Sequence, residues 1–364
     1  MAESQHHARK LPTDFEQIPI VWRYELLKYL RSKRLVGSVA IAALVIALIF
    51  VIPPATGSPY NGTDKAVKIW VTGPEIPGMQ LVSGIGYLNR SVVVADSLEV
   101  FQDGVLYPSG QGANWAFSTT LLGQSVNVIL FAQNTTGHTY TATYRWHTTS
   151  ESFATGFIGF ANLLIVICAT FFGADAIVSE YQARTGYLIF PNPIRRSTLY
   201  VGKFVASMTA SILVISIFYA VTGILSLVSV SGLDKDFFLS FAFALEFLLA
   251  VMAIAYLIST LMKGTTGATV LTFFLFVMIL PIIDSVGSLS GFKPSWSVTF
   301  SAGTMSSILT SPYPTDSFRE IPHAGLTIHT YYPDPAIAAL VMLAYALVAV
   351  AISMVLFRRK EMNG

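Results

Sequence analysis

The sequence predicts a polytopic α-helical membrane protein with six transmembrane helices, both termini cytoplasmic, and an extracellular all-β, sandwich-like insert between helices 1 and 2. Three observations predict this fold. The chain is 53% hydrophobic and only 12% charged, whereas a typical globular domain has roughly 25% charged residues. Long stretches without charge recur along it, and a Thr-, Ser- and Asn-rich segment separates the first two of them. This composition excludes a cytosolic enzyme, a nucleic-acid-binding protein and a disordered protein.

Six stretches are long and apolar enough to cross a bilayer, which needs about 20 residues at a rise of 1.5 Å each. In chain order they are residues 35–52, 152–174, 204–230, 237–262, 264–283 and 335–357. Backbone groups in hydrocarbon must bond within their own segment, so each stretch is predicted to be a helix. A cleaved signal peptide is the alternative for residues 35–52, but residues 1–34 are far longer than the leading region of a signal peptide.

Charge placement predicts how these helices are oriented. Fifteen of the 22 Lys and Arg residues lie in residues 1–34, in the connection 175–203, at Lys263 or after residue 357. Positive loops stay in the cytoplasm, so both termini are predicted to be cytoplasmic in a multi-pass protein of the cell membrane. Three N-x-S/T patterns, at Asn61, Asn89 and Asn134, all fall on the opposite side. They support this topology and are candidate glycosylation sites.

The segment before the first span is predicted to be a cytoplasmic tail with an amphipathic elbow helix from residue 20 to residue 34. The apolar face carries Trp22, Leu26, Tyr29 and Leu30, and the polar face carries Arg23, Glu25, Lys28 and Arg31. Such a helix is typical of a segment that lies on the inner membrane surface. The alternative is a basic juxtamembrane cluster that only sets the orientation.

Residues 53–150 are predicted to form a compact extracellular β domain. Several short runs alternate between apolar and polar residues, as half-buried strands do. The candidate strands are residues 66–72, 91–94, 97–101, 126–132 and 139–146. Asp103 and Gly104 stand between two such runs and are the residues that a tight hairpin turn prefers. About 98 residues with several short strands indicate a β-sandwich.

Residues 151–364 are predicted to contain helices 2 to 6, with a long extracellular loop at 284–334. This loop is long enough for short helices or a re-entrant element, and Asp284 is expected at a helix end that water can reach. Its aromatic residues are expected in the interfacial belt of the membrane. They are Trp296, Phe300, Tyr313, Tyr331 and Tyr332.

The chain lacks the motifs of an ATPase, a metalloenzyme or an α/β-hydrolase. No nucleotide-binding G-x-x-x-x-G-K-[ST] pattern occurs, so we predict a protein that is not an enzyme and binds no cofactor of its own. Glu246 is the clearly ionisable residue within the predicted spans. It is expected either to line a substrate path or to make a local structural pair. An ion-driven carrier would need more such groups.

The cytoplasmic connection 175–203 carries the most specific pattern. We expect helix 2 to continue through Asp175 and Glu180 and the chain to turn at Gly186. The apolar run 187–190 precedes Pro191 and Pro193, which stop a helix. Arg195 and Arg196 are then expected at the lipid headgroups. A solvated loop is the alternative, but it would not need an apolar run facing water, and such a run predicts a partner surface.

These features resemble the membrane subunits of type 2 ATP-binding-cassette (ABC) exporters. The resemblance rests on the elbow helix, six spans with both ends inside, Glu180 ahead of Gly186, the run 193–196 (PIRR), and Val201-Gly202-Lys203 at the start of the third span. The long outer segment between the fifth and sixth spans is also similar to that family. The resemblance covers about two-thirds of the chain and does not extend to the β-rich insert.

The resemblance implies that the connection 175–203 forms a coupling helix that sits in a cleft of a separate ATPase subunit. The docking residues would be Glu180, Arg184, Gly186, Tyr187, Leu188, Ile189, Phe190, Pro193, Arg195, Arg196 and Lys203, with Arg23 and Glu25 of the elbow helix as weaker candidates. Family members often have Thr directly after the glycine of this loop, whereas Tyr187 follows here. The contacts with the ATPase are therefore expected to differ.

The function predicted is that of a permease subunit of an ABC exporter. It would pair with a second permease subunit, as a homodimer, in a lipid membrane, while ATP and Mg²⁺ bind to the separate ATPase and no nucleic acid is involved. The alternative is a membrane-anchored adhesion or assembly protein whose β domain binds an outer partner.

Overall fold

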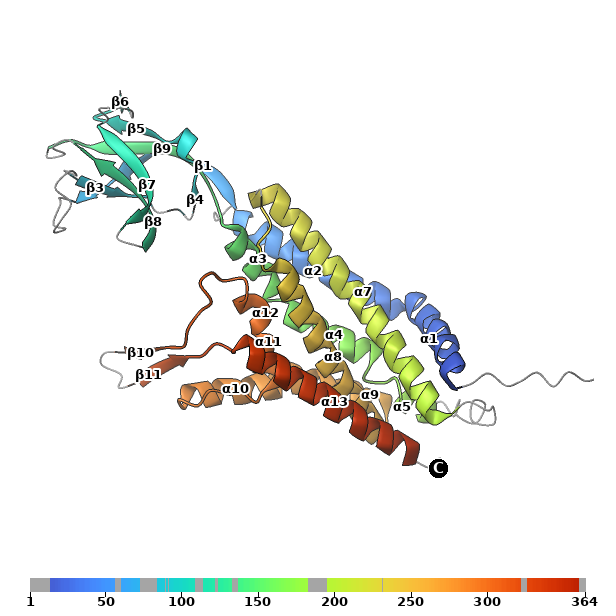
Figure 1. The fold of residues 1–364 in the computed structure, drawn as a ribbon. Coiled ribbons are helices and arrows are strands. Elements are labelled where there is room, and N and C mark those ends of the chain that lie inside the picture. The colour runs from blue at the N-terminus through green and yellow to red at the C-terminus, as the bar shows by residue number, and fades with distance from the viewer. Residues whose placement is uncertain are drawn as a thin grey trace, which may run out of the picture. The chain divides into compact units, whose positions relative to one another are not determined.

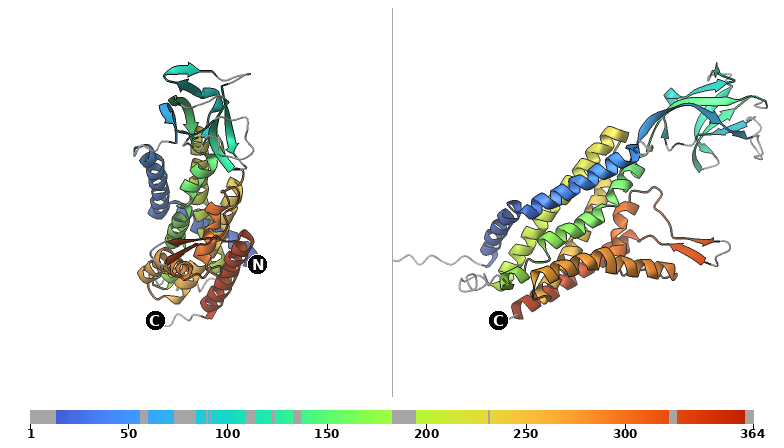
Figure 2. Two further views of the ribbon diagram at one scale, coloured as in Figure 1. Left: turned by 90° about the vertical axis from the view of Figure 1, so that its left-hand side faces the viewer. Right: turned by 180° about the vertical axis from the view of Figure 1, so that it is seen from behind.

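The computed structural model describes residues 14–55, 60–72, 84–88, 90, 92–108, 114–121, 124–132, 137–182, 195–230, 232–321 and 326–359. The chain divides into two compact units. The helical unit contains Met1–Leu48, Thr155–Thr222 and Lys235–Gly364, and the β unit contains Ile49–Ala154 and Gly223–Asp234. Figures 1 and 2 show the elements of each unit.

Six helical segments among the described residues are long and apolar enough to cross a membrane. They are α2 (Lys33–Ala55), α3 with α4 (Ser150–Ile158 and Ala161–Phe172), α7 (Arg196–Val230), α8 (Phe237–Leu261), α9 with α10 (Thr265–Phe274 and Leu280–Leu289) and α13 (Pro335–Arg359). The number and order of the predicted spans are therefore confirmed. Helices α4 and α13 both pack against α8, as the two opposite views show (Figures 1 and 2).

The elbow helix is α1, Asp14–Leu30, and it ends before the first span instead of running to residue 34. Arg31 and Ser32 form a turn, and α2 begins at Lys33. The hydroxyl of Ser32 donates to the Tyr29 carbonyl at 2.7 Å and accepts from the Leu35 N–H at 3.4 Å. Ser32 therefore closes one helix and caps the next.

Helix 2 does not continue through Asp175 and Glu180 as expected. Helix α4 ends at Phe172, a turn covers residues 173–177, and α5 spans Val178–Gln182. The hydroxyl of Ser259, on α8, accepts from the backbone N–H groups of Ile177 and Val178 at 3.0 and 3.1 Å. This side chain satisfies donors at the start of α5 and makes the interruption favourable.

The fifth span also differs from its predicted bounds. A π-helical segment, Leu275–Ile279, joins α9 to α10, and α10 continues to Leu289 instead of ending at residue 283. Asp284 lies inside α10 and is buried, so the expectation that water reaches it is wrong. One carboxylate oxygen accepts from the hydroxyl of Thr299 at 2.5 Å. The other carboxyl oxygen has no hydrogen-bond partner among the described residues, so the bond from Thr299 offsets the burial of Asp284 only in part.

The loop after the fifth span contains two short helices, which is one of the two predicted arrangements. They are α11 (Val298–Ala302) and α12 (Thr304–Ser307). The loop also contains an antiparallel hairpin of β10 (Ser317–Ile321) and β11 (Leu326–Thr330), which the sequence did not predict.

The β unit contains two antiparallel sheets. One has the order β1-β9-β5-β6, with β4 also pairing with β9, and the other has the order β2-β3-β8-β7. The strands are β1 (Asn61–Ile69), β2 (Val71–Thr72), β3 (Gly84–Tyr87), β4 (Val92–Val93), β5 (Glu99–Gln102), β6 (Val105–Tyr107), β7 (Trp115–Leu121), β8 (Gln124–Phe131) and β9 (Tyr140–His147). All five predicted strands overlap strands of the structure, whereas β3, β6 and β7 were not predicted.

Side chains of both sheets share one apolar core, as in a sandwich. It includes Val100 and Tyr144 from the first sheet and Ile129 and Phe131 from the second, each at most 1% exposed. The tight turn between β5 and β6 has Asp103 at φ 51° and Gly104 at φ 84°. These positive angles are the ones that a two-residue hairpin turn requires, which explains why the Asp-Gly pair stands there.

One ion pair fixes the edge strand β1 to the rest of the β unit. Asp64 accepts from Arg90 at 2.7 and 3.1 Å and from the indole N–H of Trp146 at 3.0 Å. The Arg90 guanidinium also lies 3.8 Å from the centre of the Trp146 ring. The hydrogen bonds from Arg90 hold the pKa of Asp64 below its ordinary value.

We expect this pair to make the β unit acid-sensitive. Because the pKa of Asp64 is lowered in the folded state, its contribution is complete above the ordinary carboxyl pKa and is lost as the pH falls through the folded value. Asp64→Asn should cost about 1 kcal/mol at pH 7, since both partners are partly exposed, and less at pH 2, where more of the carboxyl group is protonated. Thermal unfolding followed by near-ultraviolet circular dichroism measures this. An equal loss at both pH values, or an equal loss in the exposed control Asp96→Asn, would contradict it.

Candidate functional site

The predicted docking residues fall into two groups. Seven lie outside the described residues: Arg184, Gly186, Tyr187, Leu188, Ile189, Phe190 and Pro193. The others lie on α5, on α7 or directly before it, or on α1: Glu180, Arg195, Arg196, Lys203, Arg23 and Glu25. The described part of the chain therefore shows the structure from which the connection leaves and to which it returns.

Three of these residues form one buried ionic cluster. The ammonium group of Lys203 lies 2.8 Å from Glu25 Oε1 and 2.7 Å from Glu180 Oε1. The side chains of Lys203, Glu25 and Glu180 are 2%, 6% and 9% exposed, respectively. Lys28, which is largely exposed, lies 3.5 Å from the other oxygen of Glu25. This cluster, the Lys203 triad, joins α1, α5 and α7 at one point.

Glu25 belongs to the buried face of α1, which corrects its predicted place on the polar face. The buried residues of α1 are Gln17, Val21, Glu25 and Tyr29, spaced four apart. Residues at this spacing line one side of a helix. A single apolar stripe was expected from hydropathy, but Lys203 allows a carboxylate within the stripe.

Gly202 explains how α1 comes close enough for this pair. A Cβ atom placed on Gly202 would lie 2.6 Å from Val21 Cγ1 and 2.7 Å from Val21 Cβ. Only glycine allows the two helix backbones to approach in this way. Gly202 thus allows α1 to approach α7 closely. The next residue, Lys203, pairs with Glu25 of α1.

A hydrogen-bonded network continues from the triad toward α4 and α8. The Ser207 hydroxyl lies 3.1 Å from the Tyr29 hydroxyl, 2.8 Å from the Phe172 carbonyl and 2.7 Å from the Tyr256 hydroxyl. Tyr29 also donates to the Phe172 carbonyl at 3.2 Å. Burial raises the pKa of Tyr29. The last turn of α4, which precedes α5, is thereby tied to α1 and α7.

A second ion pair, which sequence reasoning missed, lies beside the triad. Arg34 binds Asp175 through two parallel contacts of 2.8 and 2.6 Å and donates to the Phe171 carbonyl at 3.0 Å. Such bidentate pairs fix geometry as well as charge. A pocket of about 280 Å³ lies here, lined by Lys28, Tyr29, Ser32, Arg34, Asp175, Ala176, Ser179 and Lys203. The sequence feature that could have indicated this pair is Asp175, an isolated acidic residue directly after an apolar span.

The remaining basic candidates lie at the surface. Arg23 is exposed on α1, Arg195 is exposed before α7, and Arg196 is the first residue of α7 and donates to the Arg358 carbonyl at 3.4 Å. Helix α7 begins eight residues before the predicted span, since a helix can continue beyond its apolar segment and lysine itself favours a helix. This placement leaves Arg23 and Arg195 accessible to a partner.

Glu246 is half-buried in α8, and the part of the chain that the structure describes shows no ion pair for it. The structure therefore does not support a local structural pair for Glu246 among the described residues. The same part of the chain shows no group of three His, Cys, Asp or Glu side chains that would hold a metal ion.

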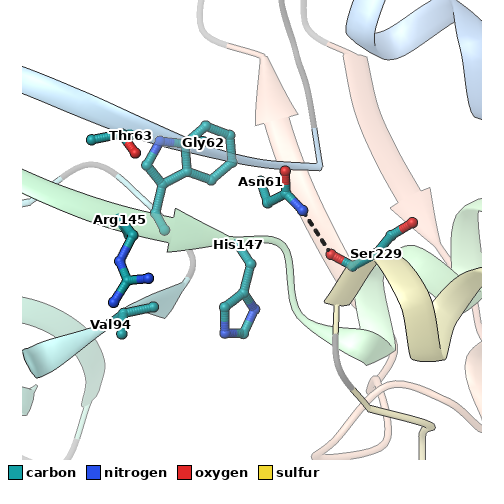
Figure 3. Close-up of a pocket in the computed structure, with 8 residues that line it drawn as sticks. Asn61, Gly62, Thr63, Val94, Arg145, His147 and Ser229 are labelled. Atoms are coloured by element: carbon teal, nitrogen blue, oxygen red, sulfur yellow. Dashed lines mark hydrogen bonds between the residues drawn. The ribbon is translucent and has the colours of Figure 1, made fainter. Parts of the chain in front are cut away.

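Of the candidate glycosylation sites, Asn89 and Asn134 lie outside the described residues. Asn61 is exposed at the start of β1, and its amide donates to the Ser229 carbonyl at 3.1 Å (Figure 3). It borders a pocket of about 330 Å³ that Arg145, Trp146 and His147 also line. Modification of Asn61 stays a prediction.

Comparison with known proteins bears on the family of this chain. Curated proteins gave no match. The family model described as ABC-2 family transporter protein matches residues 19–362, from α1 through α13. Because this match spans nearly the whole chain, the protein belongs to the ABC-2 family of transporter proteins.

Proposed function

We propose that this chain is an export permease whose separate ATPase docks on the connection 175–203, with the Lys203 triad carrying motion from that connection into the helices. Family membership makes the chain a membrane permease component that works with an ATP-binding cassette subunit. The direction of transport, the docking surface and the pairing of two copies belong to the proposal. The adhesion alternative gains no support from the family.

The observation that carries the proposal is the position of the triad at both ends of the connection. Glu180 lies on α5, which ends at Gln182, and Lys203 lies on α7, which begins at Arg196. Their ion pair of 2.7 Å therefore closes the loop that contains the apolar run 187–190. Glu25 adds α1 to the same cluster at 2.8 Å. A force applied to the loop would reach α1, α5 and α7 together.

Transport of this kind is a shift between two conformations, so ATP must favour one of them. A buried, ion-paired cluster is suited to pass that bias from a docking loop to long helices, since coupling needs elements with discrete arrangements. In the proposed assembly, two permease chains would each hold one ATPase, and ATP with Mg²⁺ would bind the ATPase. Both termini and the connection would face the cytoplasm, and the β unit would lie outside the cell.

Charged substitutions in the apolar run test this proposal. Leu188→Asp and Phe190→Asp together should remove the apolar contact and reduce recovery of the ATPase in pull-downs by at least about tenfold, with export abolished and membrane insertion intact. Affinity purification of the complex, with ATP hydrolysis as a second readout, measures this.

The chain offers a matched control in Leu106→Asp and Phe318→Asp, two apolar residues that are 57% and 78% exposed in β6 and β10. These changes should leave ATPase recovery unchanged. Normal recovery with the 188/190 variant, or equal losses in both variants, would overturn the proposed docking surface.

A further inference from the structure

Helix α8 is covered along most of its length but exposes one stripe in its first half. The stripe consists of Phe238, Ala242, Leu245, Glu246 and Leu249, which are exposed or half-buried, whereas most residues on the opposite side of the helix are buried. Their spacing of three or four residues places them on one face. The aromatic residue of the stripe, Phe238, is 73% exposed.

Glu246 lies deep in this span. It is the tenth residue of the 25 in α8, and at about 1.5 Å per residue it lies about 14 Å from Phe237, near the middle of a hydrocarbon layer of about 30 Å. A charged side chain at that depth does not face lipid, and it pairs or faces a cavity. The stripe therefore has a partner other than lipid.

The helices around α8 do not provide a cation for Glu246. Helices α4, α9, α11 and α12 contain no Lys or Arg, and the basic residues of α13 are in its last turn. The two basic residues of α7, Arg196 and Lys203, are its first and eighth residues. Within the described residues, Glu246 is thus an acidic side chain on an apolar surface, with no Lys or Arg of these helices beside it.

The residue one turn before Glu246 leaves room beside its carboxylate. Ala242 is exposed and lies four residues earlier on the same face, so the side chain that borders Glu246 on that side of the stripe is only a methyl group. Leu249, three residues later, borders the carboxylate on the other side. A bulky apolar group can therefore approach Glu246 over Ala242 without displacing a large side chain.

We propose that this stripe lines the transport path and selects an amphipathic organic cation as cargo. This inference rests on the proposed function and gives it a substrate class. The positive group of the cargo meets the Glu246 carboxylate, and its apolar body lies against Ala242 and Leu249. The exposed ring of Phe238, at the entrance of the stripe, adds to this selectivity, because the face of an aromatic ring attracts organic cations and not anions.

Two probes with the same body and opposite charge test the inference. Tetraphenylphosphonium and tetraphenylborate are measured by equilibrium dialysis against the full-length chain in lipid nanodiscs, with empty nanodiscs subtracted. The unsubstituted chain should bind the cation, and Glu246→Gln should weaken this binding by roughly tenfold or more. Glu246→Asp should retain part of the affinity for tetraphenylphosphonium. Binding of tetraphenylborate should not be strengthened by the Glu246 carboxylate.

Glu99→Gln, at an exposed position of β5, is the matched control and should bind the cation as the unsubstituted chain does. Equal cation binding with and without Glu246, or equal binding of both probes, would overturn the cargo assignment. So would a loss of chain dimers in Glu246→Gln without cation binding in the unsubstituted chain, since the stripe would then be a contact between copies. Failure to recruit an ATPase would instead overturn the proposed function, while cation binding is measured without it.

Discussion

Replacing the buried Lys203 by Met is expected to lower the free energy of unfolding of the helical unit by about 3–5 kcal/mol. The substitution leaves Glu25 and Glu180 buried, both carboxylates having lost the ammonium group that lies within 2.8 Å of each. Removing one partner of a buried ion pair costs more than removing the whole pair, because the desolvation of the remaining carboxylates is then less well offset. Thermal unfolding in detergent, followed by fluorescence and size-exclusion chromatography, measures the loss.

Two further variants separate this explanation from a simple loss of side-chain packing. Lys33→Met changes an exposed residue at the start of α2 and should be neutral within about 0.5 kcal/mol. Adding Glu25→Gln and Glu180→Gln to Lys203→Met removes the two buried negative charges and should restore part of the stability. If the triple variant is less stable than Lys203→Met alone, the two carboxylates are not the source of the loss.

The same variants report on coupling if the proposed function holds. The triple variant retains the helices but has no ion pair between α5 and α7. We expect it to recruit the ATPase through the loop and yet to transport poorly, since the connection would no longer move α1 and α7 together.

The transmembrane part of this fold was readable from sequence because a bilayer imposes a length and a composition on every span. The six segments carry this signal independently of their tertiary contacts. The first and last residues of each helix were harder to predict, because hydropathy does not show how far a helix continues beyond its apolar segment. Helix α7 starts at Arg196, eight residues before the predicted span, and Lys203 within it is buried against Glu25, which is 178 residues away along the chain.

Individual residues of the candidate site could be predicted from the sequence, but the cluster that they form could not. Glu25 belongs to the predicted elbow helix, whereas Glu180 and Lys203 belong to the predicted docking connection. Nothing in the spacing of the three residues predicts that their side chains meet. Hydropathy placed Glu25 on the outer face of α1, because a carboxylate is normally solvated. The pair of Arg34 with Asp175 was missed because Arg34 was counted only as one of the positive charges that set orientation. A residue that satisfies the inside-positive rule can also have a specific partner.

The β unit shows a different limit. Strands with clear alternation were found, whereas β3 begins with Gly84 and has a second glycine at position 86, so that alternation gives little signal. A Cβ atom on Gly86 would overlap Ile69 Cγ2, so this glycine is required by packing against β1. Close packing between strands distant in sequence is a property of the folded structure and not of local pattern.

Gly202→Ala is expected to destabilise the helical unit by about 1–3 kcal/mol through overpacking, although alanine favours a helix over glycine by roughly 1 kcal/mol. The new methyl group would lie 2.6 Å from Val21 Cγ1 and 2.7 Å from Val21 Cβ. Because the second atom is attached directly to the backbone of α1, a side-chain rotation does not relieve the contact. Helix α1 must move away from α7, and the contact of 2.8 Å between Glu25 and Lys203 must lengthen.

Gly156→Ala provides the opposite result from the same chemical change. Gly156 lies within α3, and no atom lies within 4 Å of a Cβ placed on it, so only the helix propensity acts and a gain of up to ~1 kcal/mol is expected. Thermal unfolding of the two variants should therefore shift in opposite directions. Hydrogen exchange should rise in α1 for Gly202→Ala and nowhere for Gly156→Ala, because only the first loosens the docking of α1. Parallel shifts of the two variants would show that α1 does not depend on the close approach at Gly202, and the triad would then need another explanation for its closeness.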